Sequence, residues 1–167
     1  MKAMLLGLIL GLPVLAVAAT PHADATFYKD AAEGGLAEVE LGKLAQAKGA
    51  TPAVKDFGAM MVADHSAANA KLAGIAAGKN IDLPKSPSVS QMATKGKLKL
   101  LSGDAFDKAY IKAMITDHQD DIAMFKKEAE SGQDPDAKAY AVATLPTLEE
   151  HLKKIQSIAG ASGVSAN

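Results

Sequence analysis

The chain has 167 residues, of which 49% are hydrophobic, 22% are charged and 4% are aromatic, and it contains neither cysteine nor tryptophan. This length corresponds to one globular domain, which buries enough surface to fold without a disulfide or a structural metal. The formal net charge is -1 and every basic residue is a lysine, so the sequence lacks the basic surface and the arginines typical of nucleic-acid-binding proteins.

The N-terminus, residues 1–19, predicts a secretory signal peptide. Lys2 is followed by an apolar run over residues 4–19, which ends in the small-x-small pattern Ala16-Val17-Ala18. The run is short for a stable membrane anchor, and a retained N-terminal anchor is the alternative. No cysteine follows the run, which excludes a lipoprotein anchor. We therefore expect an exported, periplasmic protein whose mature chain has no transmembrane segment.

Two helices are predicted in the first half of the mature chain. The first covers residues 26–48, with Thr26 as its N-cap and a glycine directly after its end. The second covers residues 51–79 and begins at Thr51-Pro52, an N-cap followed by proline at the first helical position. Because only a few residues join these two helices, we expect them to be antiparallel neighbours.

Two more helices are predicted in the second half of the chain. The third starts near residue 102 and ends at residue 131, and the fourth covers residues 134–160, again beginning with a cap residue and a proline. Residues 161–167 are small and polar, so we expect a flexible tail. The folded domain is therefore predicted to span residues 20–160.

A long segment, residues 81–103, connects the second and third helices. It opens with prolines and serines and continues with a lysine-rich stretch, residues 89–101, that can form a short extra helix. Two helical hairpins joined by such a crossover are typical of the ferritin-like variant of the four-helix bundle. The sequence therefore predicts an all-α, ferritin-like four-helix bundle. An up-down-up-down bundle with a flexible loop is the structural alternative.

Polar residues interrupt the apolar faces of the predicted helices. The string Met-x-x-Asp-His occurs twice, ending at His65 in the second helix and at His118 in the third. On a helical wheel, His65 lies within the apolar arc of its helix and Asp64 at the edge of that arc. In the third helix, Asp117 and Asp121 lie within the apolar arc and His118 on its flank.

Glu38 in the first helix and His151 in the fourth also fall on apolar faces near the middle of their helices. In a bundle these groups meet at one level, and burying them costs several kcal/mol unless they pair or bind an ion. The sequence therefore predicts a site for iron, manganese or zinc. The predicted ligands are Glu38, His65, Asp117, His118, Asp121 and His151. Asp64 is predicted to orient one imidazole from outside the ligand set.

Two alternatives remain open for this polar cluster. Met61 and Met114 lie four residues before His65 and His118, so a thioether and an imidazole can face one site, as Cu(I) prefers. Alternatively, Asp–His pairs satisfy one another in a metal-free core. The chain is then a structural or interaction module of the cell envelope, with an envelope protein or a second copy of itself as partner. No nucleophile signature or phosphate-binding loop is visible, so no enzymatic reaction is predicted.

Several strings resemble a bacterial family of unknown function. They are residues 31–38 (AAEGGLAE), 57–65 (Phe-x-x-x-Met-x-x-Asp-His), 106–110 (Phe-Asp-x-x-Tyr), 117–119 (Asp-His-Gln) and 145–151 (LPTLEEH). The resemblance covers residues 26–158. It implies an exported protein of the ferritin-like group, often described as a predicted outer-membrane protein, without an established activity.

The di-iron motif of ferritins, Glu-x-x-His, is not intact in this chain. Val62, Ile115 and Leu148 stand three residues before the three helical histidines, where ferritins have glutamate. Any metal site in the bundle is therefore expected to use a ligand set different from that of a ferritin.

Overall fold

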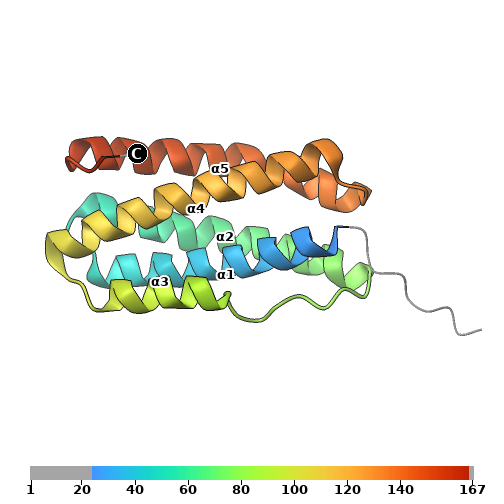
Figure 1. Ribbon diagram of the computed structural model, residues 1–167, viewed down its shortest axis with the longest axis horizontal. Coiled ribbons are helices and arrows are strands. Elements are labelled where there is room, and N and C mark those ends of the chain that lie inside the picture. Colours follow the sequence, from blue (N-terminus) through green and yellow to red (C-terminus); the bar gives the residue numbers. More distant parts are fainter. Residues whose placement is uncertain (1–23, 166–167) are drawn as a thin grey trace, which may run out of the picture.

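The computed structural model describes residues 24–165, so the predicted signal peptide lies outside the described residues. Within this range the chain forms five helices and no strand (Figure 1). The helices are α1 (Ala25–Lys48), α2 (Pro52–Gly78), α3 (Val89–Lys99), α4 (Gly103–Ser131) and α5 (Pro135–Ala161). The predicted all-α fold is confirmed, and the short helix that was predicted between the second and third long helices is present as α3.

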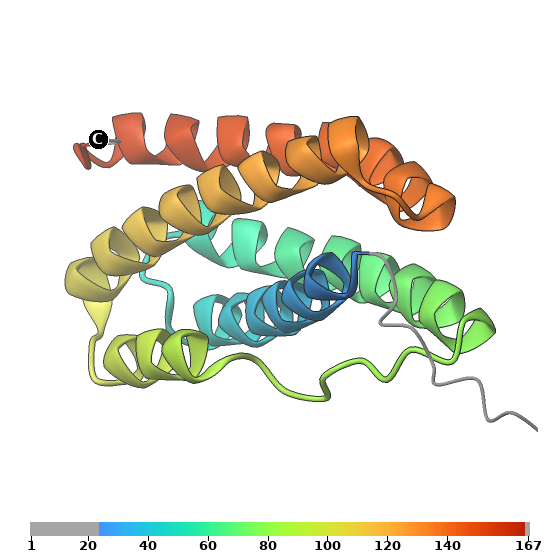
Figure 2. The ribbon, with the colours of Figure 1, turned by 45° about the vertical axis from the view of Figure 1, so that its right-hand side comes forward.

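Four long helices form the bundle as two hairpins, α1 with α2 and α4 with α5 (Figure 1). The segment after α2 returns along the bundle before α4 begins, so α2 and α4 point in the same direction. The short helix α3 lies on this return path, outside the four-helix core, and packs on α1 and α4 (Figure 2). This is the predicted crossover arrangement, and it differs from an up-down-up-down bundle.

Side-chain caps place the starts of α2 and α5 where the sequence predicts them. The Thr51 hydroxyl accepts a hydrogen bond from the first turn of α2, and Pro52 occupies the first helical position. Asp134 caps α5 in the same way ahead of Pro135. The carboxylate of Asp107 on α4 also accepts hydrogen bonds from the Thr51 backbone N–H at 2.9 Å and the Thr51 hydroxyl at 2.8 Å, which fixes the α1–α2 turn against α4.

The helix ends differ slightly from the predicted boundaries. α1 begins at Ala25, one residue before the predicted cap Thr26, and α5 continues to Ala161. Beyond α5, Gly163 adopts a φ of 62°, which is readily available to glycine, and the Val164 N–H donates to the Ala159 carbonyl at 2.9 Å. Val164 is 8% exposed and packs on the core, so ordered packing continues past residue 160.

The apolar core consists of two clusters with a polar layer between them. The first cluster lies towards the α1–α2 turn and includes Phe57, Met61, Tyr110, Met114 and Ile155. The second lies towards the α4–α5 turn and includes Phe27, Tyr28, Leu72, Phe125 and Leu148. On each long helix, one buried polar residue separates the members of the first cluster from those of the second. These residues are Glu38, His65, His118 and His151.

Glycines bring α1 and α2 unusually close together beside this polar layer. A Cβ atom on Gly42 of α1 would lie 2.6 Å from the carbonyl oxygen of Gly58 on α2, and a Cβ on Gly58 would lie 2.6 Å from the carbonyl oxygen of Gly42. A side chain does not fit at either position, because its Cβ would collide with the facing carbonyl oxygen. Helices in contact through larger residues keep their axes about 8–10 Å apart. The pair therefore sets how near His65 lies to Glu38.

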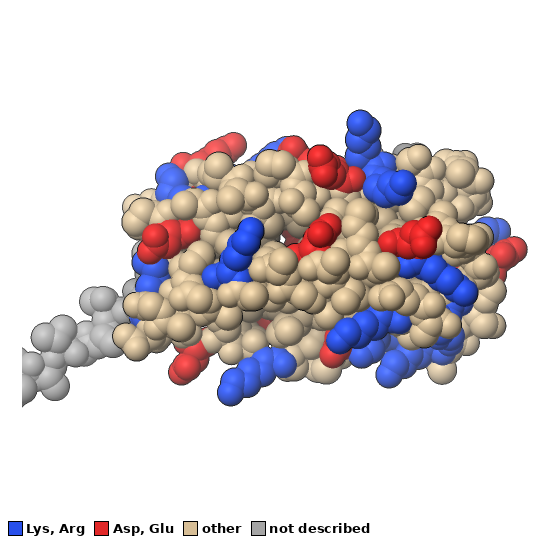
Figure 3. All heavy atoms as spheres, turned by 180° about the vertical axis from the view of Figure 1, so that it is seen from behind, with Lys and Arg blue, Asp and Glu red and all other residues tan. Residues whose placement is uncertain are grey.

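The outer surface carries charges of both signs. On the face seen in Figure 3, lysines and acidic side chains are interspersed. Among the described residues, no helix combines the length and the apolar character needed to cross a lipid bilayer.

Candidate metal centre

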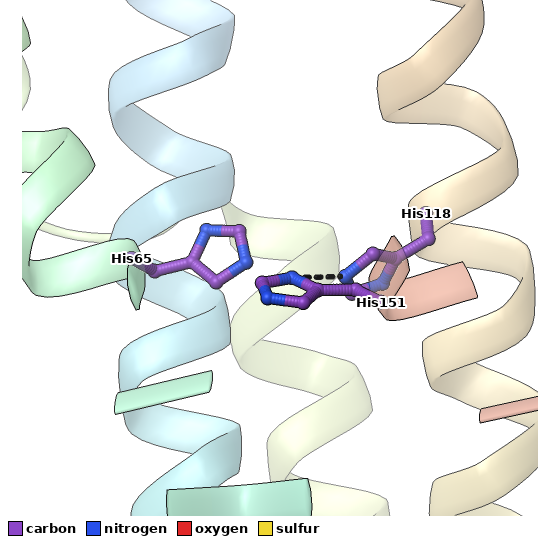
Figure 4. Close-up of side chains that lie close together, drawn as sticks. All are labelled: His65, His118 and His151. Carbon is purple, nitrogen blue, oxygen red and sulfur yellow. Dashed lines mark hydrogen bonds between the residues drawn. The ribbon is translucent and has the colours of Figure 1, made fainter. Parts of the chain in front are cut away.

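Three imidazole rings meet in the polar layer, each from a different helix (Figure 4). His65 comes from α2, His118 from α4 and His151 from α5, and their exposed fractions are 5%, 0% and 2%. The ring centroids form a nearly equilateral triangle with sides of 5.3, 5.4 and 5.8 Å. One nitrogen from each ring can be chosen so that all three nitrogens lie within 4.8 Å of one another.

The hydrogen-bond partners of His118 and His151 determine where their protons lie. Nδ1 of His118 is 2.9 Å from the backbone carbonyl oxygen of Met114, which can only accept, so Nδ1 carries the proton. Nε2 of His151 is 2.8 Å from a carboxylate oxygen of Asp64, so Nε2 donates there. The remaining nitrogens, Nε2 of His118 and Nδ1 of His151, therefore direct lone pairs at each other across 3.3 Å.

A proton between these two nitrogens is disfavoured by their surroundings. Burial, together with the neighbouring His65 and His151, lowers the pKa of His118 to about 3. Burial also lowers the pKa of His151, although the hydrogen bond that His151 donates to Asp64 opposes this. The neutral state is therefore favoured for both rings. Besides each other, the facing nitrogens have one further polar neighbour in the described layer, Oε1 of Glu38, which lies 3.3 Å from Nε2 of His118.

His65 and Glu38 complete the layer from the α1–α2 hairpin. Nδ1 of His65 lies 2.7 Å from Oε2 of Glu38, a contact that is an ion pair only when the ring is protonated, and neither oxygen of Glu38 makes a hydrogen bond. Oε1 of Glu38 lies 3.3 Å from Nε2 of His118. The other nitrogen of His65, Nε2, is also buried without a partner. Burial lowers the pKa of His65, so its ring too is favoured in the neutral state.

Glu38 is the most completely buried acid in the layer, with 0% of its surface exposed. Burial first, and then the negative charge of Asp117, raise the pKa of Glu38 well above its usual range. Beside Glu38 and His65 lies a cavity of about 10 Å³, close to the smallest volume that holds one water molecule or ion. The layer therefore combines buried polar atoms that lack hydrogen-bond partners with room for a single small ligand.

The spacing of these atoms matches that of ligands around a small metal ion. Ligand atoms at 2.0–2.1 Å from a tetrahedral ion are separated by about 3.3–3.4 Å. Nε2 of His118 lies 3.3 Å both from Nδ1 of His151 and from Oε1 of Glu38. Around His118, two spacings therefore match those between ligands of one small ion, and a nitrogen of His65 lies within 4.8 Å of nitrogens of the other two rings.

Asp117 and Asp121, which the sequence predicts as ligands, lie at the edge of the layer. The wheel put Asp117 inside the apolar arc and His118 on its flank, and the structure reverses this order, since His118 is fully buried and both aspartates are partly exposed. The reason is that the buried residues Ile111, Ile115 and Ile122 shift the core face of α4 towards His118. The two aspartates turn towards a groove bordered by α1 and α3.

Met61 and Met114, the predicted alternative ligands for copper, lie in the first apolar cluster and are fully buried. Met114 acts on the site through its backbone, because its carbonyl oxygen binds Nδ1 of His118. The four-residue spacing of Met114 and His118 predicts that the thioether can reach the ring, and in the structure the same spacing brings the backbone carbonyl of Met114 to it. No side-chain type in the sequence indicates that a backbone carbonyl binds the ring. The spacing of four residues nevertheless permits a hydrogen bond from a helical histidine to that carbonyl.

Comparisons with known proteins identify the family of the chain and other proteins with its fold. The sequence profile of a domain of unknown function (DUF4142) matches residues 12–158. The chain belongs to the DUF4142 family. The predicted resemblance to a family of unknown function is thereby confirmed at the level of the family. Among curated proteins, none matches the chain.

Two known helical proteins share the fold. One is a DUF305 protein from Streptomyces coelicolor, described as secreted, with 16% identity over 85% of this chain and 94% of the other, and a TM-score of 0.72. The other is CopM, whose Cu(I)-bound form gives 13% identity over 84% of this chain and 97% of the other, with a TM-score of 0.69. CopM in its Ag-bound form gives a TM-score of 0.65, again with 13% identity and with 84% and 97% of the two chains covered. At such low identity the likeness shows the fold alone.

Proposed function

We propose that this DUF4142 protein binds one monovalent copper ion, Cu(I), at the three histidines of the polar layer. The observation that carries the proposal is the 3.3 Å contact between two imidazole nitrogens whose protons are held on the opposite sides of their rings. The ligands are His65, His118 and His151, with Glu38 beside them. Asp64 and the Met114 carbonyl hold the rings in the orientation that binding requires.

A cation explains this contact better than a metal-free core does. Two lone pairs facing each other in a buried site repel, and leaving Nε2 of His65 and both oxygens of Glu38 unpaired adds a further cost. A metal-free core selected to fix helix register would be expected to place a donor opposite each acceptor. One positive ion at the centre would replace the repulsion between the two facing nitrogens by attraction to both.

The low charge of Cu(I) suits the surroundings. The cost of transferring an ion from water into a buried site rises with the square of its charge, so a monovalent ion is favoured over a divalent one. Two carboxylates contact the rings, Asp64 and Glu38, and the fully buried one, Glu38, can neutralise one positive charge when it ionises. Neutral imidazoles are good ligands for copper. CopM, which has the same fold, is known in Cu(I)-bound and Ag-bound forms.

Zinc is the second candidate, and the tetrahedral spacing around His118 favours it. Three imidazoles and one carboxylate form a common zinc ligand set. Iron and manganese prefer more oxygen ligands, which Asp117 and Asp121 would have to supply by moving inward. The site holds an ion rather than a substrate, because the adjoining cavity of about 10 Å³ admits little more than a water molecule. We therefore propose metal binding in the cell envelope, without a chemical reaction.

Export is part of the proposal. The apolar run over residues 4–19, with its small-x-small end, is typical of a secretory signal, and the DUF305 protein that shares the fold is described as secreted. A periplasmic location would expose the site to copper entering the envelope, so a protective role against metal stress follows from the location and the ligands together.

The test is a titration of the purified protein with Cu(I) under anaerobic conditions, with Ag(I) and Zn(II) in parallel. We expect Cu(I) and Ag(I) to raise the melting temperature, with about 2.7 kcal/mol of added stability at an ion concentration 100 times the dissociation constant. X-ray absorption of the copper form should show nitrogen or oxygen neighbours at about 2.0 Å and no sulfur at about 2.3 Å. A sulfur shell would instead assign Met61 or Met114 as ligands.

Matched variants separate lost ligands from a damaged core. Replacement of His65, His118 or His151 by asparagine removes one ligand each, and each variant should lose the thermal shift. Phe57→Leu is the control, because the Phe57 ring packs edge-on against His118 and His151 at 6.2 and 6.4 Å but offers no ligand. This control should melt lower and keep the shift. If the wild-type protein binds neither Cu(I) nor Ag(I), the proposal fails, and a preference for Zn(II) would replace copper by zinc.

A further inference from the structure

An acidic groove leads from the surface towards the three histidines. It lies between the first half of α1, the start of α3 and the middle of α4, and its volume is about 1070 Å³. Seven carboxylates and a single lysine line it. The groove therefore has a strongly negative lining, in contrast to the mixed charges of the face in Figure 3.

The inner end of the groove adjoins the metal centre. Asp121 lines the groove and also lines the small cavity that contains Glu38 and His65. Asp121 is thus the residue that the two linings share. The Glu38 side chain, which is 0% exposed and has no hydrogen-bond partner on either oxygen, lines the same cavity from the other side.

The carboxylates at this inner end lack cationic partners. Asp117 and Asp121 form no salt bridge with any lysine that the structure describes, and Oδ2 of Asp117 is buried without a hydrogen-bond partner. At the outer end, by contrast, Glu33 is paired with Lys29 at 3.0 Å. Burial raises the pKa of both carboxyl groups, that of Asp117 to about 6. Since neither has a lysine partner, their oxygens are available to a cation next to the histidines.

Gly34 on α1 lies beside the groove, next to the carboxylate of Asp121. A Cβ atom built there would lie 3.6 and 3.7 Å from the two carboxylate oxygens of Asp121, and 3.9 Å from the side-chain nitrogen of Gln91 on α3. A longer side chain at this position would occupy the space in front of Asp121 without changing the charge of the groove.

We propose that this groove is the path by which the metal cation reaches the histidines, with Asp117 and Asp121 as a transient carboxylate site at its inner end. This inference rests on the proposed function. Carboxylates attract cations of any type but hold Cu(I) weakly, because their oxygens are hard ligands and imidazole nitrogens are better matched to this ion. Transfer from the aspartates to the histidines is therefore favourable, and a hydrated ion loses its water gradually along the path.

A path changes rates, whereas a ligand changes affinity, and this difference defines the test. The probe is Ag(I), which has the charge of Cu(I) but is not oxidised by air, mixed rapidly with the protein in chloride-free buffer. Binding is followed through tyrosine fluorescence, since the chain contains three tyrosines and no tryptophan. Release is followed after addition of a strong chelator, and the dissociation constant is measured at equilibrium.

The first variant pair compares charge in the groove with charge elsewhere. Asp117→Asn/Asp121→Asn should slow both binding and release by at least about tenfold and weaken the dependence of the binding rate on ionic strength. Its dissociation constant should stay within about fivefold of the wild-type value. The control is Asp56→Asn/Asp104→Asn, which removes the same charge from exposed positions on α2 and α4 and should leave all rates unchanged.

The second variant, Gly34→Leu, blocks the groove and keeps its charge. It should slow binding and release to a similar extent while the ionic-strength dependence stays that of the wild type. Unchanged rates in both the charge variant and the blocking variant would overturn the path. A large loss of affinity with an unchanged binding rate would also overturn it, because Asp117 and Asp121 would then be ligands. If the wild-type protein takes up no Ag(I) at all, the proposed function fails first and the path fails with it.

Discussion

The two Asp–His pairs of the bundle share a local sequence but have different surroundings. On α2, Asp64 is half exposed and its carboxylate binds Nε2 of His151 on α5. On α4, Asp117 lies in the acidic groove and binds no histidine, while its neighbour His118 is held by a backbone carbonyl. In both pairs the histidine faces the core, because adjacent helical residues differ in direction by about 100° and only one of them can do so. The aspartate side chain then contacts whatever group of a neighbouring helix lies beside it.

The difference assigns separate roles to identical strings. Asp64 orients an imidazole that belongs to another helix, so we expect it to act on affinity. Asp117 stands where a cation arrives, so we expect it to act on rate. A repeated motif in a sequence is therefore weak support for a repeated function, since the neighbouring helices decide what each copy contacts.

The largest effect is expected from His118→Leu, which breaks the α4 pair at its buried member. Metal affinity should fall by more than about 100-fold, beyond the range seen when an orienting group is lost. The metal-free protein should be no less stable than the wild type, and more stable by up to about 2 kcal/mol, because an apolar side chain of similar size removes the facing lone pairs. Calorimetric titration and chemical denaturation measure the two quantities. A marked loss of metal-free stability would support a core in which the histidines fix helix register.

Gly42→Ala tests how the α2 pair is positioned. The added methyl group collides with the Gly58 carbonyl and should push α2 away from α1, which lowers the free energy of unfolding by about 2–3 kcal/mol. His65 should then move away from Glu38 and bind metal less well, whereas the α4 pair keeps its place. Denaturation and metal titration of this variant check both effects. Gly74→Ala on α2, where a Cβ meets nothing within 4 Å, is the matched control and should leave stability unchanged or slightly raised.

Asp64→Asn compared with Asp117→Asn sharpens the contrast between the two aspartates. Loss of the Asp64 carboxylate should weaken metal binding by about 10–100-fold, the range typical of an orienting partner. The same change at Asp117 should alter the equilibrium affinity much less. Competition with a chromophoric Cu(I) chelator measures both variants. Equal losses of affinity at the two positions would mean that both aspartates act on the bound ion, and the division of roles would be incorrect.

The smallest effect concerns the outer end of the acidic groove. Burial first, and then the negative charge of Asp24, raise the pKa of Glu128 from 4.5 to about 7. Because the pKa is higher in the folded state, ionisation of Glu128 opposes folding, and stability falls as pH rises from about 4.5 to 7. Glu128→Gln should therefore raise the free energy of unfolding at pH 8 by about 1 kcal/mol, since nearby solvent screens part of the effect. At pH 4 the variant and the wild type should be equal.

The control for this measurement is Glu130→Gln, two residues further along α4, where the side chain is exposed. It should show no such pH dependence. The measurement is thermal denaturation across the pH range. If the difference in stability between Glu128→Gln and the wild type is the same at pH 4 and at pH 8, the raised pKa is contradicted.

The sequence was sufficient for the fold because its signals are local. Thr51-Pro52 and Asp134-Pro135 mark helix starts directly, and the length of the segment over residues 81–103 distinguishes a crossover from a hairpin. The level at which Glu38 meets the histidines also follows from the helix lengths. These features depend on the backbone and on short-range chemistry, which the sequence displays.

The details of the site depended on packing that no single helix displays. The burial of His118 relative to Asp117 is set by three isoleucines that rotate the core face of α4, and a wheel centred on the aromatic residues misses them. The tautomers of His118 and His151 depend on a backbone carbonyl and on a carboxylate from α2. The acidic groove exists only because α3 packs on α1 and α4, a contact between segments that lie far apart in the chain.

The polar layer draws its members equally from the two hairpins. Glu38 and His65 belong to α1 and α2, whereas His118 and His151 belong to α4 and α5, and packing is denser within each hairpin than between them. An ion bound by members of both hairpins would tie the two halves of the molecule together, as a disulfide does in many exported proteins. This chain has no cysteine to form one. Its resistance to separation of the halves, and to the proteases that attack opened bundles, would then vary with the metal content of its surroundings.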